Sequence, residues 1–123
     1  MKRDPDLIRE LLNYLEENLD GINSIESTSI LIPGYSEPQI AYHIGLLQNA
    51  SLIKAALPDN AIDESLWFIT GLTWAGHEFI EAARNDTIWN KVKSKLNPAG
   101  GFVMEIAKPL LVQYMKELVI NGM

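Results

Sequence analysis

One stretch, residues 36–72, constrains the fold more than any other part of the sequence. It opens with Ser36-Glu37-Pro38-Gln39, which matches the S-x-x-Q capping box, where serine and glutamine satisfy free backbone N–H groups at a helix start. Apolar residues at helical spacing follow, so we expect a helix over residues 37–49. Two short apolar runs, 52–57 and 66–72, come next and flank a polar loop. This order predicts a capped helix that leads directly into a β-hairpin.

The N-terminal segment predicts one helix and one strand. Asp4 suits the N-cap and Pro5 the first helical position, and Asp20-Gly21 ends the helix. Residues 29–32 are rich in β-branched side chains and are bounded by serines and by Pro33-Gly34, so we expect a strand there. The apolar stripe of the helix recurs at helical spacing through Leu7, Ile8, Leu11, Leu12, Leu15 and Leu19.

Three helical segments are expected after the hairpin. Thr73 suits the N-cap of a helix that runs to about Arg84. Residues 85–87 offer new capping side chains, so a break and a second start are expected there, with an apolar face that continues to Leu96. A proline and two glycines then stop the helix, and a last helix is expected over residues 102–120.

The order of elements and the length predict one domain. A chain of 123 residues with 47% hydrophobic side chains is ordinary for a single folded unit with a modest core. We expect an α+β fold, mostly helical, with a small three-stranded antiparallel sheet. Residues 1–96 would form the core of this domain, and residues 97–123 would add a C-terminal helix.

Composition limits where the chain acts and what it binds. No run approaches the roughly 18 apolar residues of a membrane-spanning helix, so no membrane partner is expected. The absence of cysteine excludes disulfides and thiolate metal sites, and it favours a reducing compartment, the cytoplasm. Sixteen acidic residues against ten basic ones give a net charge of −6, which disfavours binding to a polyanion unless the basic residues gather locally.

A capped helix followed by a hairpin and a second capped helix is the arrangement of winged-helix proteins. Residues 42–53 resemble the end of a recognition helix that runs into a wing. Leu72-Thr73-Trp74-Ala75-Gly76 resembles the Leu-Thr-x-x-Gly that opens the helix after the wing. The chain departs from the pattern at residues 21–35, which predict strand and loop where a supporting helix is usual. It also departs at Ser51, which replaces a glycine, so the turn there is expected to differ.

The whole chain also resembles a family of small bacterial and prophage proteins described as domain of unknown function 2513. The match lies in residues 1–4, the pair Tyr42-His43, and the stretches 72–79 and 86–91. This resemblance covers residues 1–96 well and the last helix loosely. It implies a winged-helix-like fold and brings no activity and no functional residues with it.

The two histidines do not predict an enzyme. His77 begins a His-Glu-x-x-Glu pattern, whereas a zinc-protease helix needs a second histidine where this chain has Glu81. We interpret His77 as a packed or interfacial residue, and His43 as a satisfied residue at the border of the core. No phosphate-binding glycine loop, nucleophile motif or dinucleotide fingerprint occurs. We therefore expect no catalytic residue, no metal and no cofactor.

Two non-enzymatic functions remain, and we favour a protein-interaction or assembly module. The alternative is a DNA-binding transcriptional regulator, since outward glutamine, asparagine and tyrosine side chains on the helix over residues 37–49 could contact bases. Residues 36–53 contain no lysine or arginine, and the hairpin loop is acidic, so phosphate contacts would have to come from later residues. Gly45 also falls on this outward face. The candidate nucleic-acid contacts are Gln39, Tyr42, Gln48, Asn49, Arg84, Lys91 and Lys95.

The last helix predicts self-association. Its apolar residues come in pairs at four-residue steps, and each step advances about 40° beyond a full turn, so the stripe winds by roughly 160°. One end would meet the parent core and the other a second surface, unless a kink at Pro109 lets one chain cover the whole stripe. We expect a homodimer. We also expect this helix to cover Trp74. The alternative is that Trp74 belongs to an exposed interaction patch. The candidate self-association residues are Leu111, Tyr114, Met115 and Leu118.

Overall fold

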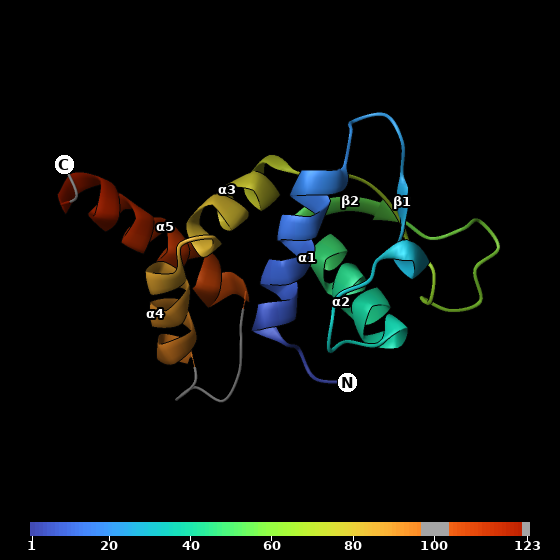
Figure 1. The fold of residues 1–123 in the computed structure, drawn as a ribbon, viewed down its shortest axis with the longest axis horizontal. Coiled ribbons are helices and arrows are strands. Elements are labelled where there is room, and N and C mark those ends of the chain that lie inside the picture. The colour runs from blue at the N-terminus through green and yellow to red at the C-terminus, as the bar shows by residue number, and fades with distance from the viewer. Residues whose placement is uncertain (97–103, 122–123) are drawn as a thin grey trace.

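The computed structural model describes residues 1–96 and 104–121, and it confirms the α+β class (Figure 1). The predicted helices over 37–49, 73–84 and 86–96 are all present within a residue or two of their expected ends. The elements in chain order are α1 (Pro5–Asn18), β1 (Ile25–Glu26), the 3₁₀ turn η1 (Ser27–Ser29), α2 (Glu37–Asn49), β2 (Ile53–Ala56), β3 (Phe68–Leu72), α3 (Trp74–Ala83), α4 (Asp86–Leu96) and α5 (Met104–Asn121).

Local capping side chains set the predicted helix starts. The Asp4 carboxylate accepts hydrogen bonds from the backbone N–H groups of residues 6 and 7 at the start of α1. Ser36 and Gln39 form both halves of the capping box at α2. Thr73 Oγ1 accepts from the backbone N–H of Gly76 at α3. These side chains satisfy N–H groups that have no partner inside the helix, which is why the sequence placed these ends correctly.

The sheet is antiparallel with the order β1-β3-β2, and the strand predicted over residues 29–32 is wrong. The first strand is Ile25–Glu26, which pairs with β3. The backbone N–H of Ser27 donates to the carbonyl of Trp67 at 2.9 Å, and the backbone N–H of Trp67 donates to Ser27 Oγ at 3.0 Å. With these bonds the strand ends at Glu26, and the chain continues into the 3₁₀ turn η1. Ile30 and Ile32 are buried but pair with no strand. Their apolar side chains therefore indicate burial and not a strand.

Helix α1 lies between the two halves of the molecule (Figure 1). The sheet and α2 lie on one side of it, and α3, α4 and α5 lie on the other. Its apolar stripe from Leu7 to Leu15 is fully buried, as is Trp89 of α4, whose ring meets Phe79 edge to face at 6.2 Å. Within the described residues, no helix is both long and apolar enough to cross a membrane.

Backbone geometry is tight where α2 leads into the hairpin. Ser51 takes the left-handed conformation with φ of 61°, so the turn keeps the glycine-like shape that we expected a serine to change. The carbonyl of Leu52 then passes so close to α3 that a Cβ on Gly76 would lie 2.0 Å from its oxygen. The Leu-Thr-x-x-Gly stretch therefore needs glycine at position 76, because the hairpin backbone approaches α3 too closely there for a side chain.

Candidate functional site

The predicted base-reading face of α2 is largely engaged within the protein. Gln39 Oε1 accepts from the backbone N–H of Ser36, and Gln48 Oε1 accepts from the backbone N–H of Ala55, each at 2.8 Å. Gly45 was predicted to point outward, but it is buried against Trp67, whose ring would lie 3.3 Å from a Cβ at this position. Among the predicted contacts on α2, Tyr42 and Asn49 are exposed.

The predicted basic contacts lie on the other side of α1, away from α2 (Figure 1). Arg84 forms an ion pair with Glu16 and lies 3.7 Å from Glu81. Lys91 Nζ stands 5.6 Å from the centre of the Tyr114 ring. Lys91 and Lys95 share an open groove of about 930 Å³ between α4 and α5, lined by Thr87, Asn90, Lys91, Ser94, Lys95 and Tyr114. The structure therefore separates the candidate base contacts from the candidate phosphate contacts.

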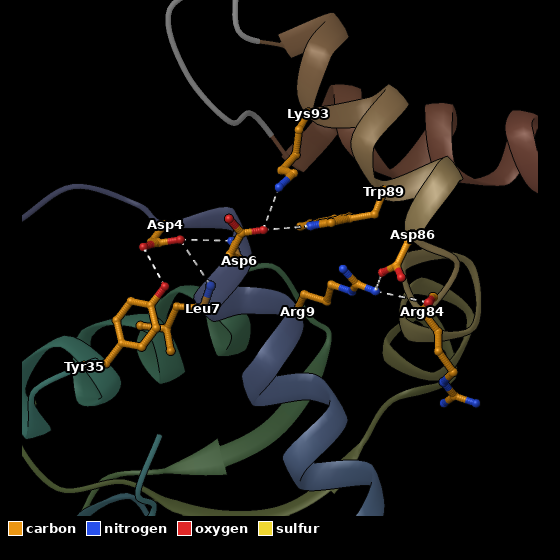
Figure 2. Close-up of polar contacts among 9 residues, drawn as sticks. All are labelled: Asp4, Asp6, Leu7, Arg9, Tyr35, Arg84, Asp86, Trp89 and Lys93. Atoms are coloured by element: carbon orange, nitrogen blue, oxygen red, sulfur yellow. Dashed lines mark hydrogen bonds and ion pairs between the residues drawn. The ribbon is translucent and has the colours of Figure 1, made fainter. Parts of the chain in front are cut away.

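A polar cluster joins the start of α1 to α4 (Figure 2). Asp6 Oδ1 accepts from Trp89 Nε1 at 3.0 Å and from Lys93 Nζ at 2.8 Å. Burial would raise the pKa of Asp6, but the hydrogen bonds from Lys93 and Trp89 outweigh it and hold the pKa below its usual 3.8. Arg9 pairs with Asp86 and donates to the carbonyl of Arg84 at 3.1 Å. All of these contacts are between residues of the same chain, and they hold α1 against α4.

A second polar cluster holds the N-cap residue of α1. Asp4 Oδ2 accepts from the Tyr35 hydroxyl at 3.0 Å (Figure 2), and its backbone N–H donates to His43 Nε2 at 2.8 Å. Burial, followed by the hydrogen bond to Asp4, raises the pKa of Tyr35 to about 12. The other ring nitrogen of His43 donates to the carbonyl of Gln39 at 2.8 Å. Both nitrogens of this buried histidine are satisfied, as the sequence predicted.

His77 lies at the surface of α3. Its Nδ1 is 3.8 Å from Glu16 Oε2, and just over half of its side chain is exposed. Glu81, the second position of the His-Glu-x-x-Glu pattern, faces Arg84. Within residues 1–96 and 104–121, no group of three or more histidine, cysteine, aspartate or glutamate side chains is arranged to hold a metal ion.

An open groove lies between α3 and α5, and Trp74 stands on its edge. Trp74 is 80% exposed, so the prediction that the last helix covers it is wrong. The groove has a volume of about 400 Å³. Its α3 wall consists of Trp74, His77, Glu78, Glu81 and Ala82, and its α5 wall consists of Val112, Met115 and Lys116.

The two ends of α5 have different surroundings, as the winding stripe predicted. Ala107 and Leu111 are buried in the core, whereas the last turns project beyond α3 and α4 (Figure 1). Leu111 is only 1% exposed, because it packs in the core of its own chain. Tyr114 and Met115 are half-buried, and Leu118 is exposed. The helix continues through Pro109, and residues 116–121 at its far end are exposed.

Sequence reasoning missed Val112, Lys116 and Glu78 as groove residues. A signal for the α5 wall was present, because residues 112, 116 and 119 follow one another at helical spacing on a face separate from the buried pairs. The position of α3 beside that face depends on how the two helices pack, which the spacing does not encode.

Comparisons with known proteins place the chain in a family. The family model described as "Hypothetical protein (DUF2513)" matches residues 2–102, a range that ends before α5. An uncharacterized protein of Haemophilus influenzae is 36% identical over 96 residues, which cover 78% of this chain and 79% of that protein. No solved structure matches the chain. On the family model and this relative, the chain belongs to the DUF2513 family.

Proposed function

We propose that this protein is a non-enzymatic protein-interaction module that acts through the groove between α3 and α5. The observation that carries the proposal is Trp74, which is 80% exposed at the edge of an apolar groove. Tryptophan is among the residues that contribute most to protein interfaces, because one rigid ring buries a large apolar area.

The surface next to Trp74 supports this function. Val112 lies in the groove, and Val119 and Ile120 extend the apolar surface along the projecting end of α5. Contiguous apolar surface of this kind, with charged side chains at its edge, is typical of docking sites for other proteins. The cytoplasm, expected from the absence of cysteine, is part of the proposal.

The polar clusters support a function without catalysis. A general base needs a ring nitrogen or carboxylate that is free to reach a substrate. Both ring nitrogens of His43 are engaged with backbone groups, and Asp6 is held by Trp89 and Lys93. The titratable groups nearest the core thus serve internal contacts.

Site-specific photocrosslinking in the native host tests the proposed surface. A photoreactive phenylalanine analogue in place of Trp74 should give a covalent adduct with a protein partner, because the side chain would be buried in the complex. The matched control carries the analogue in place of Ile62, which is fully exposed in the β2–β3 loop and far from the groove. The absence of an adduct at position 74, or equal adducts at both positions, would contradict the proposal.

Nucleic-acid binding is a second candidate, and the groove between α4 and α5 favours it. This groove brings Lys91 and Lys95 together with hydroxyl and amide side chains, and none of the described residues that line it carries a carboxylate. Phosphate contacts make such binding strongly dependent on salt. Fluorescence anisotropy with random duplex DNA should show binding at low salt that Lys91→Glu abolishes; a flat titration at low salt would exclude this candidate.

A further inference from the structure

We infer that the partner in the groove between α3 and α5 is a second copy of this chain, docked with its α5 antiparallel to the first. This inference rests on the proposed function and names its partner. It goes beyond a dimer through the last helix in general, because it assigns the face, the direction and the contacting residues.

The first observation is that the α3 wall of the groove and the exposed apolar face of α5 have the same length. On the α3 wall, Trp74 and Glu81 are seven residues apart, which is two helical turns or about 10 Å. On α5, Val112 and Val119 are also seven residues apart and lie on one face. A two-fold axis between Met115 and Lys116 would bring Val119 of one copy onto Val112 of the other. The groove of each copy would then receive the projecting end of the other's α5.

The second observation is charge. Glu78 and Glu81 stand on the α3 wall of the groove, and Lys116 stands on the α5 wall. A two-fold interface must be self-complementary, since each residue that meets a partner residue is met by its own equivalent. In the antiparallel arrangement the α5 of one copy lies along the α3 of the other. Lys116 of each copy therefore approaches the acidic wall of its partner, and the contact occurs twice.

The size of this surface indicates a weak dimer. Eight residues line the groove, and the projecting end of α5 adds a few more. Standard interfaces use roughly 20–30 residues on each side, so this surface falls at the small end, where weak and transient contacts are found. Such a dimer would form and dissociate with protein concentration in the cell.

Charge reversal with mixing tests the intermolecular contact directly. Lys116→Glu alone, and the double variant Glu78→Lys/Glu81→Lys alone, should each weaken self-association by about tenfold or more in sedimentation equilibrium, because like charges meet twice. An equimolar mixture of the two variants should recover association, since both contacts in the mixed dimer then join opposite charges. Contacts within one chain cannot produce this recovery. Glu117→Lys, on the opposite side of α5, is the matched control and should leave the dimer unchanged.

The remaining outcomes separate this inference from the proposed function. A wild-type chain that stays monomeric at about 200 µM, or a mixture that stays monomeric while circular dichroism shows folded protein, overturns the second copy as partner. If the adduct at position 74 then contains a different protein, the interaction module stands and the partner is that protein. If no adduct forms at all, both proposals fail. An adduct at twice the mass of the chain, with recovery on mixing, supports both.

Discussion

His43 Nε2 accepts a hydrogen bond from the backbone N–H of Asp4 at 2.8 Å, so a side chain in the middle of α2 holds the residue that caps α1. Because the bond donor is a backbone N–H, Nε2 carries no proton. The proton is on Nδ1, which donates to the carbonyl of Gln39. This single tautomer joins the N-cap of one helix to the body of another.

The first prediction concerns this bond. His43→Leu should lower the free energy of unfolding by about 1–3 kcal/mol, because it leaves the part-buried N–H of Asp4 without its His43 acceptor. Urea denaturation measures the change, and nitrogen-detected NMR of the wild type should show the Nδ1–H tautomer. His77→Leu is the control and should change stability by less than about 0.5 kcal/mol, since His77 is exposed. Equal effects at the two positions would contradict the assignment.

The second prediction concerns Asp6 and pH. Its lowered pKa means that the folded state binds fewer protons than the unfolded state at acid pH, so its contribution is present above the usual pKa of 3.8 and is lost as pH falls through the lower folded value. Asp6→Asn should therefore cost stability at pH 6 and little at pH 2. The difference is a few tenths of a kcal/mol, because the carboxylate is half exposed. Parallel stability curves for the two proteins between pH 6 and pH 2 would show that the Lys93 contact contributes nothing.

The third prediction concerns the approach of the hairpin to α3. Gly76→Ala should destabilise the fold by about 1–3 kcal/mol or more, because the new Cβ would lie 2.0 Å from the Leu52 carbonyl oxygen. Gly71→Ala is the control, since the nearest atom to its new Cβ is in the Lys54 side chain at 4.0 Å. Thermal unfolding should separate the two variants, and similar midpoints would mean that the backbone yields at Gly76.

The fourth prediction concerns the left-handed turn after α2. Ser51→Gly should stabilise the protein by up to about 1 kcal/mol, because a residue with a Cβ is strained at φ of 61°. Gly34→Ala should do the opposite by a similar amount, because Gly34 has φ of 88° in open space, where only the backbone conformation is at stake. Chemical denaturation of both variants measures the strain, and a loss of stability in Ser51→Gly would show that the serine is favoured for another reason.

The helix starts could be predicted because each depends on neighbours in sequence. Asp4, Ser36 and Thr73 cap helices through bonds that span two or three residues. The first strand could not, since its position follows from Ser27 and Trp67, which are 40 residues apart. A local apolar pattern such as Ile30 and Ile32 identifies buried residues, and only the distant partner decides which of the neighbouring residues enter the sheet.

The candidate site was predictable in part. The winding stripe of α5 correctly placed one end in the core and left the other uncovered, because helical periodicity alone determines it. The exposure of Trp74 depends on where α5 lies beside α3, and no spacing within either helix encodes that distance. Gly45 was placed on the wrong face for a related reason, because Trp67 from another segment widens the buried arc of α2.

The contacts of Asp6 with Trp89 and Lys93 also bear on how the protein is made. These residues are separated by 83 and 87 positions, and they join the start of α1 to α4. Ribosomes add about 5–20 residues per second, so the interval between synthesis of Asp6 and of Lys93 is roughly 4–17 s. During that time the leucine stripe of α1 lacks one of the two surfaces that later enclose it. The domain therefore completes its core only after α4 has been synthesised.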